Sequence, residues 1–172
     1  MVDQGGEFWR YLSQNQKDLI VEGQYLISDV VKDDALHFKD YSFLIFPFAK
    51  AYEGFLKQLF RDIGFISRLD YISDHLRLGK LMSPDLISRL GDRSLYKKIE
   101  MTADKALADE IWETWKVGRN QIFHYFPHNL KAVGFAEAEE IVNQITRVME
   151  KAFEKLRLAH TVKKLEQFIA VK

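Results

Sequence analysis

The residues best suited to chemistry lie in the stretch VGRNQIFHYFPHN, residues 117–129. Arg119 is followed directly by Asn120 and, after three further residues, by His124. An imidazole exchanges protons near neutral pH, and a guanidinium offers a planar fork that binds phosphate or carboxylate oxygens. Side chains of these types can bind an anion and move a proton beside it.

The spacing of this arginine and histidine does not by itself identify a site. Arg68 and His75, in RLDYISDH, satisfy a similar spacing, so the surrounding sequence must decide between the two matches. On an ideal helix Arg119 falls inside an apolar sector that contains Trp112 and Trp115. A guanidinium placed there is stacked on a tryptophan, paired with a carboxylate, or aimed into a cleft. Arg68 lies in a segment without a clean helical face, which favours the stretch around Arg119.

Helical geometry limits how these groups could act together. Asn120 and His124 are four residues apart and share one helix face. Arg119 and His124 are five apart, roughly 140° around an ideal helix. They could meet only if the helix loosens before Pro127, or if two copies of the chain bring them together across a two-fold axis. We therefore expect a dimer, or a site at the frayed end of a helix.

A second unusual residue is Glu53, midway along the apolar stretch FAKAYEGFLKQLF. A carboxylate in such a helix needs a partner, because burying an unpaired charge is costly. Lys50 and Lys57 are its neighbours within the helix, and Arg119 is the candidate from another helix. The adjacent Gly54 would let another helix or a ligand approach closely.

Hydrophobic periodicity predicts the elements that must position these residues. Four long helices are expected, over residues 7–31, 40–63, 103–125 and 135–158. Short helices ending at Gly79 and Gly91 are expected between the second and third, and residues 159–172 form a basic tail. Asp40 or Ser42 could cap the second long helix, Gly64 could end it, and Thr102 could cap the third. The sequence thus predicts one all-α domain over residues 1–172.

Composition restricts the other classes of function. The formal net charge is +0, with 25 basic and 25 acidic residues, so total charge gives no support to nucleic-acid binding. The absence of cysteine excludes disulfides and thiolate metal sites, and the five histidines show no metal-ligand spacing with carboxylates. No apolar run approaches the roughly 18 residues of a membrane span. We expect a cytoplasmic protein without a membrane anchor, a metal or a cofactor.

The stretch GRNQIFH resembles the arginine–polar–x–x–x–histidine signature of the HEPN superfamily of small helical bundles. Many members are metal-independent endoribonucleases of toxin–antitoxin, abortive-infection or CRISPR defence systems. The position of Glu53 in the second long helix is similar to the arrangement in the RNase domain of the RNase LS toxin family, where a glutamate, an arginine and a histidine form the functional set. The resemblance implies that Glu53, Arg119 and His124 are catalytic, with Asn120 as the polar residue. Some HEPN toxins carry a modifiable tyrosine two residues after the histidine, but here that position is Phe126.

The resemblance implies a bundle of four long antiparallel helices with short helical inserts between the second and third. It further implies cleavage of single-stranded RNA through attack by the 2′-hydroxyl. The enzyme would be a homodimer with a composite active site. Its role would be that of a toxin or phage-defence effector, with a cognate antitoxin as partner. The residues expected to contact RNA are Lys57, Lys116, His128 and Asn129.

A different class of function remains open, a non-catalytic helical module that binds RNA, a nucleotide or a protein partner. An arginine lying flat on Trp112, with His124 bonded to the backbone, would favour this alternative. An Arg119 directed to solvent, away from Glu53 and His124, would remove the geometry that a nuclease needs.

Overall fold

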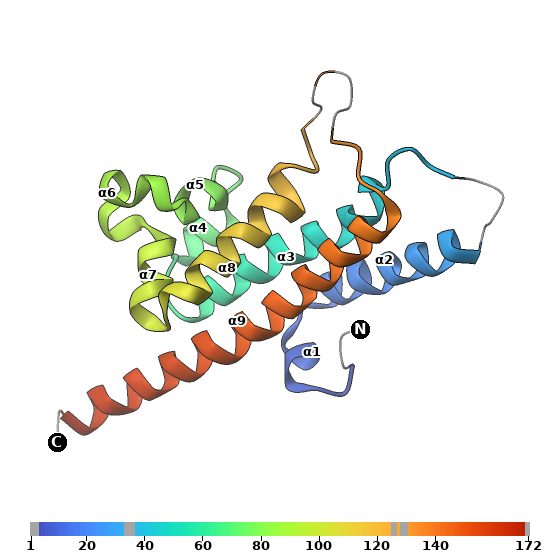
Figure 1. Ribbon diagram of the computed structural model, residues 1–172. Coiled ribbons are helices and arrows are strands. Elements are labelled where there is room, and N and C mark those ends of the chain that lie inside the picture. The colour runs from blue at the N-terminus through green and yellow to red at the C-terminus, as the bar shows by residue number, and fades with distance from the viewer. Residues whose placement is uncertain (1–3, 33–36, 125–126, 128–130, 171–172) are drawn as a thin grey trace. The chain divides into compact units, whose positions relative to one another are not determined.

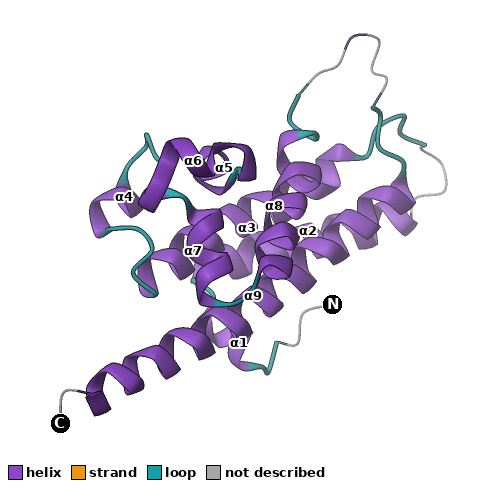
Figure 2. Ribbon diagram, turned by 60° about the vertical axis from the view of Figure 1, so that its left-hand side comes forward, coloured by secondary structure: helices purple, strands orange, loops and turns teal. Residues whose placement is uncertain are grey.

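The prediction of an all-α fold is confirmed for the described part of the chain. The computed structural model describes residues 4–32, 37–124, 127 and 131–170. These residues form helices joined by turns, and no β-strand occurs among them (Figure 2). Across the same ranges, every helix is too short or too polar to cross a membrane.

Figure 1 shows the helices along the chain. The α-helices are α1 Glu7–Tyr11, α2 Gln14–Lys32, α3 Ser42–Asp62, α4 Arg68–Ile72, α5 Leu78–Met82, α6 Ile87–Leu90, α7 Leu95–Thr102, α8 Lys105–Trp115 and α9 Phe135–Ala170. Two 3₁₀ turns, η1 Pro84–Leu86 and η2 Gly91–Arg93, flank α6, and a π-helical turn, η3 Lys116–Asn120, follows α8. Short helices thus lie in sequence between α3 and α8, where inserts were expected.

The chain forms two compact units, each made from two stretches of sequence. Unit 1 comprises residues 1–55 and 114–148, and unit 2 comprises residues 56–113 and 149–172. Glu53, Arg119, Asn120 and His124 all belong to unit 1. The geometry of the candidate site can therefore be described within this unit alone.

The first predicted helix, over residues 7–31, is in fact two helices. A new helix starts after Ser13 because Ser13 and Gln16 form a reciprocal cap. The Gln16 amide N–H donates to Ser13 Oγ (3.4 Å), and the Ser13 amide N–H donates to Gln16 Oε1 (3.1 Å). Gln16 is buried, and its side chain packs against Gly54 of α3, where an added Cβ would stand 3.4 Å from Gln16 Nε2. The close approach expected at Gly54 is thus made by a side chain of α2.

Helix α3 matches its prediction closely. Asp40 Oδ1 accepts the amide N–H of Ser42 (2.9 Å) and so stabilises the start of the helix. Gly64 ends it with a φ of +76°, which only glycine adopts without strain. The helix is buried along most of its length in unit 1, where Phe48 and Tyr52 are fully enclosed. Glu53 is therefore held on a rigid element, as a positioned carboxylate requires.

The short helix predicted to end at Gly79 is wrong in position, because the chain is non-helical over residues 73–77 and α5 begins only at Leu78. Gly91 ends α6 with a φ of +54°, as expected, but Gly79 lies inside α5 and ends no helix. Helix α5 continues to Met82 because Leu78, Leu81 and Met82 are all buried. Burial of an apolar face outweighs the low helix propensity of a single glycine.

The third predicted helix, residues 103–125, begins and ends differently from the prediction. Thr102 is the last residue of α7 rather than a cap. Asp104 caps α8 instead, because its Oδ1 accepts the amide N–H of Leu107 (2.7 Å). Regular α-helix stops at Trp115, and the chain continues through the π turn. Helix α9 runs beyond the expected residue 158 to Ala170, so much of the predicted tail is helical.

Candidate functional site

Arg119 and Glu53 form an ion pair within unit 1. Arg119 Nε donates to Glu53 Oε2 at 2.9 Å, across 66 residues of sequence. The side chains are 40% and 26% exposed, so the pair lies at a partly enclosed surface. The arginine from another helix, one of the partners expected for Glu53, is thus observed beside it. The two terminal guanidinium nitrogens of Arg119 make no hydrogen bond to any described residue.

Aromatic rings form the platform beneath this guanidinium. Arg119 Cζ lies 4.9 Å from the ring centre of Trp115 and 6.0 Å from that of Phe123. Trp115 is 2% exposed, and its indole N–H has no hydrogen-bond acceptor among the described residues. Phe123 in turn contacts Phe46 of α3, with ring centres 5.4 Å apart. A cation over aromatic faces is attracted by their quadrupoles, and these rings also restrict its rotamers.

Two of the environments predicted for Arg119 therefore occur together. It is paired with a carboxylate and also lies against a tryptophan, which is Trp115 rather than Trp112. The ion pair is formed through Nε, the nitrogen nearest the aliphatic stem. This arrangement leaves the far edge of the guanidinium able to bind an anion.

The π turn positions Arg119 between α8 and the loop that follows. The Gln121 amide N–H donates to the Lys116 carbonyl (3.0 Å), five residues back, which widens the helix at this turn. Of the two alternatives for bringing Arg119 and His124 together, a loosened helix is thus present in the single chain. Such π turns occur frequently at functional sites.

Gly118 allows the π turn to pack closely on α9. A Cβ at this position would stand 2.9 Å from Cδ1 and 3.1 Å from Cγ1 of Ile145. Nearby, Gln144 Nε2 of α9 donates to Oγ1 of the buried Thr114 (3.0 Å), which fixes the end of α8. This supporting role of Gly118 was not predicted from the sequence. The one feature of the sequence that pointed to close packing here is the position of Gly118 among large apolar residues of a helical sector.

His124 lies in the bend after the π turn and is exposed. Its side chain makes no hydrogen bond or ion pair with Arg119, Glu53 or another described residue. Asn120, the last residue of the π turn, is half-buried, and its side chain has no hydrogen-bond partner within the described ranges. The structure therefore brings Glu53 and Arg119 together. The side chains of Asn120 and His124, which follow Arg119 in sequence, form no hydrogen bond or ion pair with either of them.

The residues expected to contact RNA have different positions. Lys116 is the half-buried first residue of the π turn, three residues before Arg119. Lys57 is half-buried in the part of α3 that belongs to unit 2. His128 and Asn129 lie outside the described residues. Of the four expected RNA contacts, Lys116 is thus both described by the structure and close to Arg119 in sequence.

The second match to the arginine–histidine spacing does not form a similar arrangement. Arg68 begins α4, is exposed, and makes no ion pair with a described carboxylate. His75 lines a separate hollow of about 250 Å³ in unit 2, beside Arg77, Lys80 and Arg93. Within the described residues, Arg119 forms an ion pair with a carboxylate from a distant part of the sequence and Arg68 does not. This difference favours the stretch around Arg119 over the stretch around Arg68.

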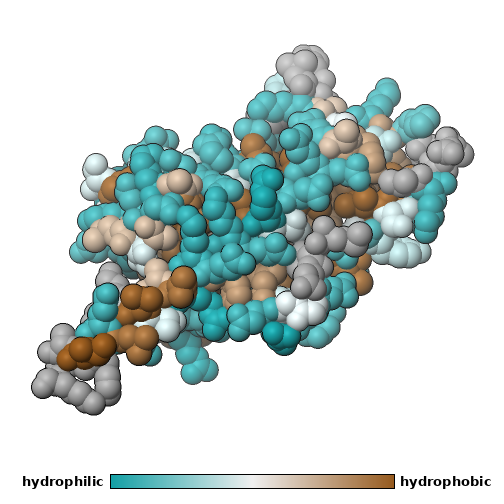
Figure 3. Space-filling view, turned by 60° about the horizontal axis from the view of Figure 1, so that its bottom comes forward, coloured by the Kyte–Doolittle hydropathy of each residue, from teal (hydrophilic) through white to brown (hydrophobic). Residues whose placement is uncertain are grey.

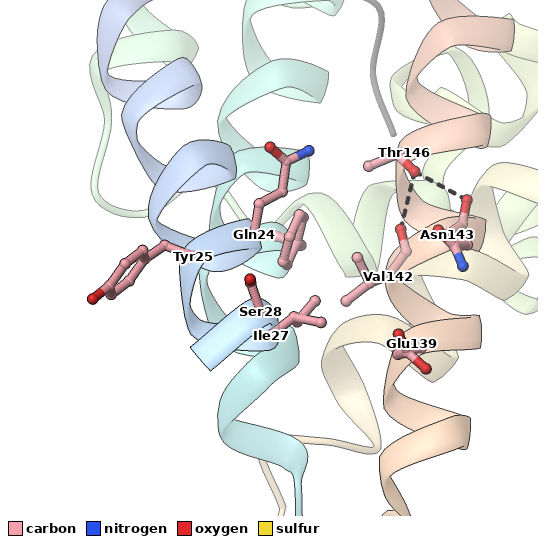
Figure 4. Close-up of a pocket in the computed structure, with 9 residues that line it drawn as sticks. Gln24, Tyr25, Ile27, Ser28, Glu139, Val142, Asn143 and Thr146 are labelled. Carbon is pink, nitrogen blue, oxygen red and sulfur yellow. Dashed lines mark hydrogen bonds between the residues drawn. The ribbon is translucent and has the colours of Figure 1, made fainter. Parts of the chain in front are cut away.

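Unit 1 also contains a cavity of about 570 Å³ between α2 and α9 (Figure 4). Ile27 and Ser28 point into it from α2 and Val142 points into it from α9, whereas Tyr25 points away. The lining residues are Gln24, Tyr25, Ile27, Ser28, Phe48, Glu139, Val142, Asn143 and Thr146. Glu139 is their single charged member, so the lining offers no acid–base pair. The candidate chemistry is therefore assigned to the surface around Arg119 rather than to this cavity.

Neither a metal-ligand set in the described part of the chain nor a match to a known protein accompanies this geometry. Among the described residues, no group of three or more histidines, cysteines, aspartates or glutamates could hold a metal ion. Comparisons of the chain with family models, curated proteins and solved structures find no match. The function is therefore inferred from the geometry of the site and from the motif.

Proposed function

We propose that this chain is a metal-independent endoribonuclease that cleaves single-stranded RNA at a site containing Arg119, Glu53 and His124. The observation that carries the proposal is the guanidinium of Arg119. It is bound through Nε by Glu53 and supported by Trp115, and its terminal nitrogens have no partner among the described residues. A phosphodiester offers two oxygens that match this fork.

The proposed reaction uses the nucleophile that RNA carries. The 2′-oxygen attacks the adjacent phosphorus while the bond from phosphorus to the 5′-oxygen breaks. The 2′-hydroxyl proton goes to a neutral imidazole, and the departing 5′-oxygen takes a proton from an imidazolium. Arg119 stabilises the charge that develops on the non-bridging oxygens. The products end in a 2′,3′-cyclic phosphate and a 5′-hydroxyl.

One histidine cannot be both base and acid in the same step, so the proposal includes a homodimer. Two copies would supply two His124 side chains to a composite site, with Asn120 orienting an imidazole or bonding a phosphate oxygen. The exposure of His124 supports a role that depends on a substrate or a second copy. By the resemblance to HEPN proteins, we propose a toxin or phage-defence effector, with a cognate antitoxin as partner.

The proposal is tested with RNA that contains a single cleavable nucleotide, in the presence of EDTA. Wild type should cleave the RNA, and should leave intact a matched strand whose cleavable nucleotide is 2′-deoxy. Arg119→Ala should lower the cleavage rate by about 100-fold, as removal of one transition-state donor does. Arg68→Ala, at the other arginine–histidine match, serves as the control and should cleave at the wild-type rate.

Two results would contradict this function. Cleavage of the 2′-deoxy strand would mean that the nucleophile is not the neighbouring hydroxyl. RNA that binds without being cut, with equal affinity for wild type and Arg119→Ala, would instead favour the non-catalytic binding module.

A further inference from the structure

The last turns of α9 carry an apolar stripe that unit 2 does not cover. Its members are Leu158, Val162, Leu165 and Ile169, with exposed fractions of 67%, 46%, 57% and 71%. Figure 3 shows apolar atoms, in brown, gathered at this end of the chain. Single exposed aliphatic residues are common on protein surfaces, but four in one row on one helix form a contiguous patch.

The spacing of the stripe is that of a coiled-coil seam. Successive members are four, three and four residues apart, which places all four within an arc of roughly 60° on an ideal helix. An apolar face that packs on a protein core, or lies in a membrane surface, spans about 100° or more. A strip this narrow fits the line along which two helices wind around each other.

The residue types at each position indicate which kind of coiled coil is formed. In heptad notation Leu158 and Leu165 occupy d positions, and Val162 and Ile169 occupy a positions. Leucine at d with a β-branched residue at a favours parallel, two-stranded coils. We infer that the stripe is a docking surface for the same helix of a second copy of this chain, in parallel and in register.

The charges around the stripe suit a second copy better than an acidic partner. The e and g positions that border the seam include Ala159, Thr161 and Glu166. In a parallel pair, Thr161 of one copy lies beside Glu166 of the other, so these residues bring no like charges together. The basic residues Arg157 and Lys164 fall at c positions, away from the seam. An acidic partner or an anionic membrane would require cations next to the apolar strip.

The size of the stripe sets the strength of the pairing. A buried aliphatic side chain removes on the order of 100 Å² from water. Eight half-exposed side chains, four from each copy, therefore bury on the order of 500 Å² of apolar surface, less than the ~1,200–2,000 Å² of stable interfaces. The dimer made by this seam is therefore reversible and dissociates on dilution. The inference depends on α9 alone and stands whether or not the chain cleaves RNA.

Sedimentation equilibrium of the full chain across micromolar concentrations tests the inference. Wild type should pass from monomer to dimer as concentration rises, and Leu165→Glu should raise the dissociation constant by at least about tenfold. Lys164→Glu, a neighbouring charge change off the seam, should keep the dimer within about twofold of wild type. Far-UV circular dichroism should show the same helix content in all three. A wild type that stays monomeric, or a Leu165→Glu variant that dimerises normally, overturns the inference.

Cross-linking tests the orientation, because the chain contains no cysteine. In the parallel arrangement two copies of residue 169 face each other, so Ile169→Cys should form a disulfide-linked dimer on mild oxidation. An antiparallel pair would place residue 169 opposite residue 158, and would link Ile169→Cys only to Leu158→Cys. That second pattern overturns the parallel arrangement. Binding of the monomer to anionic phospholipid vesicles, lost in Leu165→Glu, would assign the stripe to a membrane surface instead.

Discussion

Arg119 is held by two neighbours of different chemistry, and substitution can separate their contributions. Glu53 provides a charge and an acceptor for Nε, whereas Trp115 provides an aromatic face. Both ion-pair partners are partly exposed, so solvent screening weakens their attraction. The pair positions a guanidinium more than it stabilises the fold.

The first prediction concerns the energy of that pair. Glu53→Gln and Arg119→Gln, combined in a double-mutant cycle, should give a coupling free energy of about 0.5–1 kcal/mol in urea unfolding. The coupling arises because glutamine preserves the approximate shape while removing the charge. Single effects that add without coupling would mean that the ion pair has no energetic role in solution. Asp62→Asn combined with Arg61→Gln, a pair on the exposed end of α3, provides the comparison.

At the residue scale, the sequence allowed the pairing to be anticipated but left His124 undetermined. Glu53 and Arg119 are charged groups in apolar helical sectors, and burial forces such groups to find partners. His124 follows an irregular turn and has no hydrogen-bond or ion-pair partner among the described residues, so no local rule fixes its orientation. The role proposed for it depends on the substrate or on a second copy, neither of which is encoded in local periodicity.

At the element scale, the π turn needs both its hydrogen bond and room for its backbone. The Gln121-to-Lys116 bond defines the turn, and Gly118 brings it against Ile145 of α9. A side chain at position 118 would force these elements apart. The position of Arg119 therefore depends on a neighbour that carries no functional group.

The second prediction is that Gly118→Ala lowers the free energy of unfolding by about 1–3 kcal/mol, the usual range for overpacking. Truncation of the obstructing side chain in Gly118→Ala/Ile145→Val should recover part of this loss, since the Cδ1 atom nearest the new Cβ is removed. Gly134→Ala is the matched control, because nothing lies within 4 Å of its Cβ position. Urea unfolding of the four proteins measures these effects. Equal stability of Gly118→Ala and wild type would contradict the described packing.

The third prediction concerns acid sensitivity of the α7–α8 region in unit 2. The Lys105 ammonium, at 2.7 Å, and the Tyr96 hydroxyl both donate to Asp109 and hold the pKa of its carboxyl below its usual range. Because the folded pKa is lower than the unfolded one, the stabilisation is present above about pH 4. It is lost as pH falls through the folded pKa. Asp109→Asn should therefore be less stable than wild type at neutral pH.

Unfolding midpoints in urea at pH 7 and pH 3 test this behaviour. The difference between wild type and Asp109→Asn should shrink at the lower pH, because the unfolded carboxyl binds a proton there more readily than the folded one does. Asp74→Asn provides the control, because Asp74 forms no ion pair with another described residue. A gap that widens at pH 3 would contradict the assigned interactions.

Helix positions were predictable from the sequence where one interaction dominates. The pattern located α3 closely because its apolar residues are nearly continuous and Gly64 ends it. It missed the break at Ser13 because the reciprocal cap interrupts an otherwise helical pattern. It also missed the end of α8, because a π turn keeps helix-like spacing while changing the hydrogen bonds.

At the scale of the whole molecule, two compact units share the chain, and one all-α domain over residues 1–172 stays a prediction. Units formed from separate stretches of sequence cannot be recognised by scanning for a linker, because no linker divides them. The number of chains in the working assembly is likewise set by surfaces rather than by periodicity. The proposed nuclease and the proposed α9 seam are therefore tested on the full chain.

RNA cleavage at the site of Arg119 and His124 can be checked by comparing three proteins. Wild type, His124→Ala and His75→Ala are incubated with single-stranded RNA in EDTA, and the ends of the products are identified. We expect 2′,3′-cyclic phosphate ends from wild type and His75→Ala, and a rate at least about 100-fold lower for His124→Ala. Equal cleavage by all three proteins, or no cleavage by any of them, would contradict the proposed function.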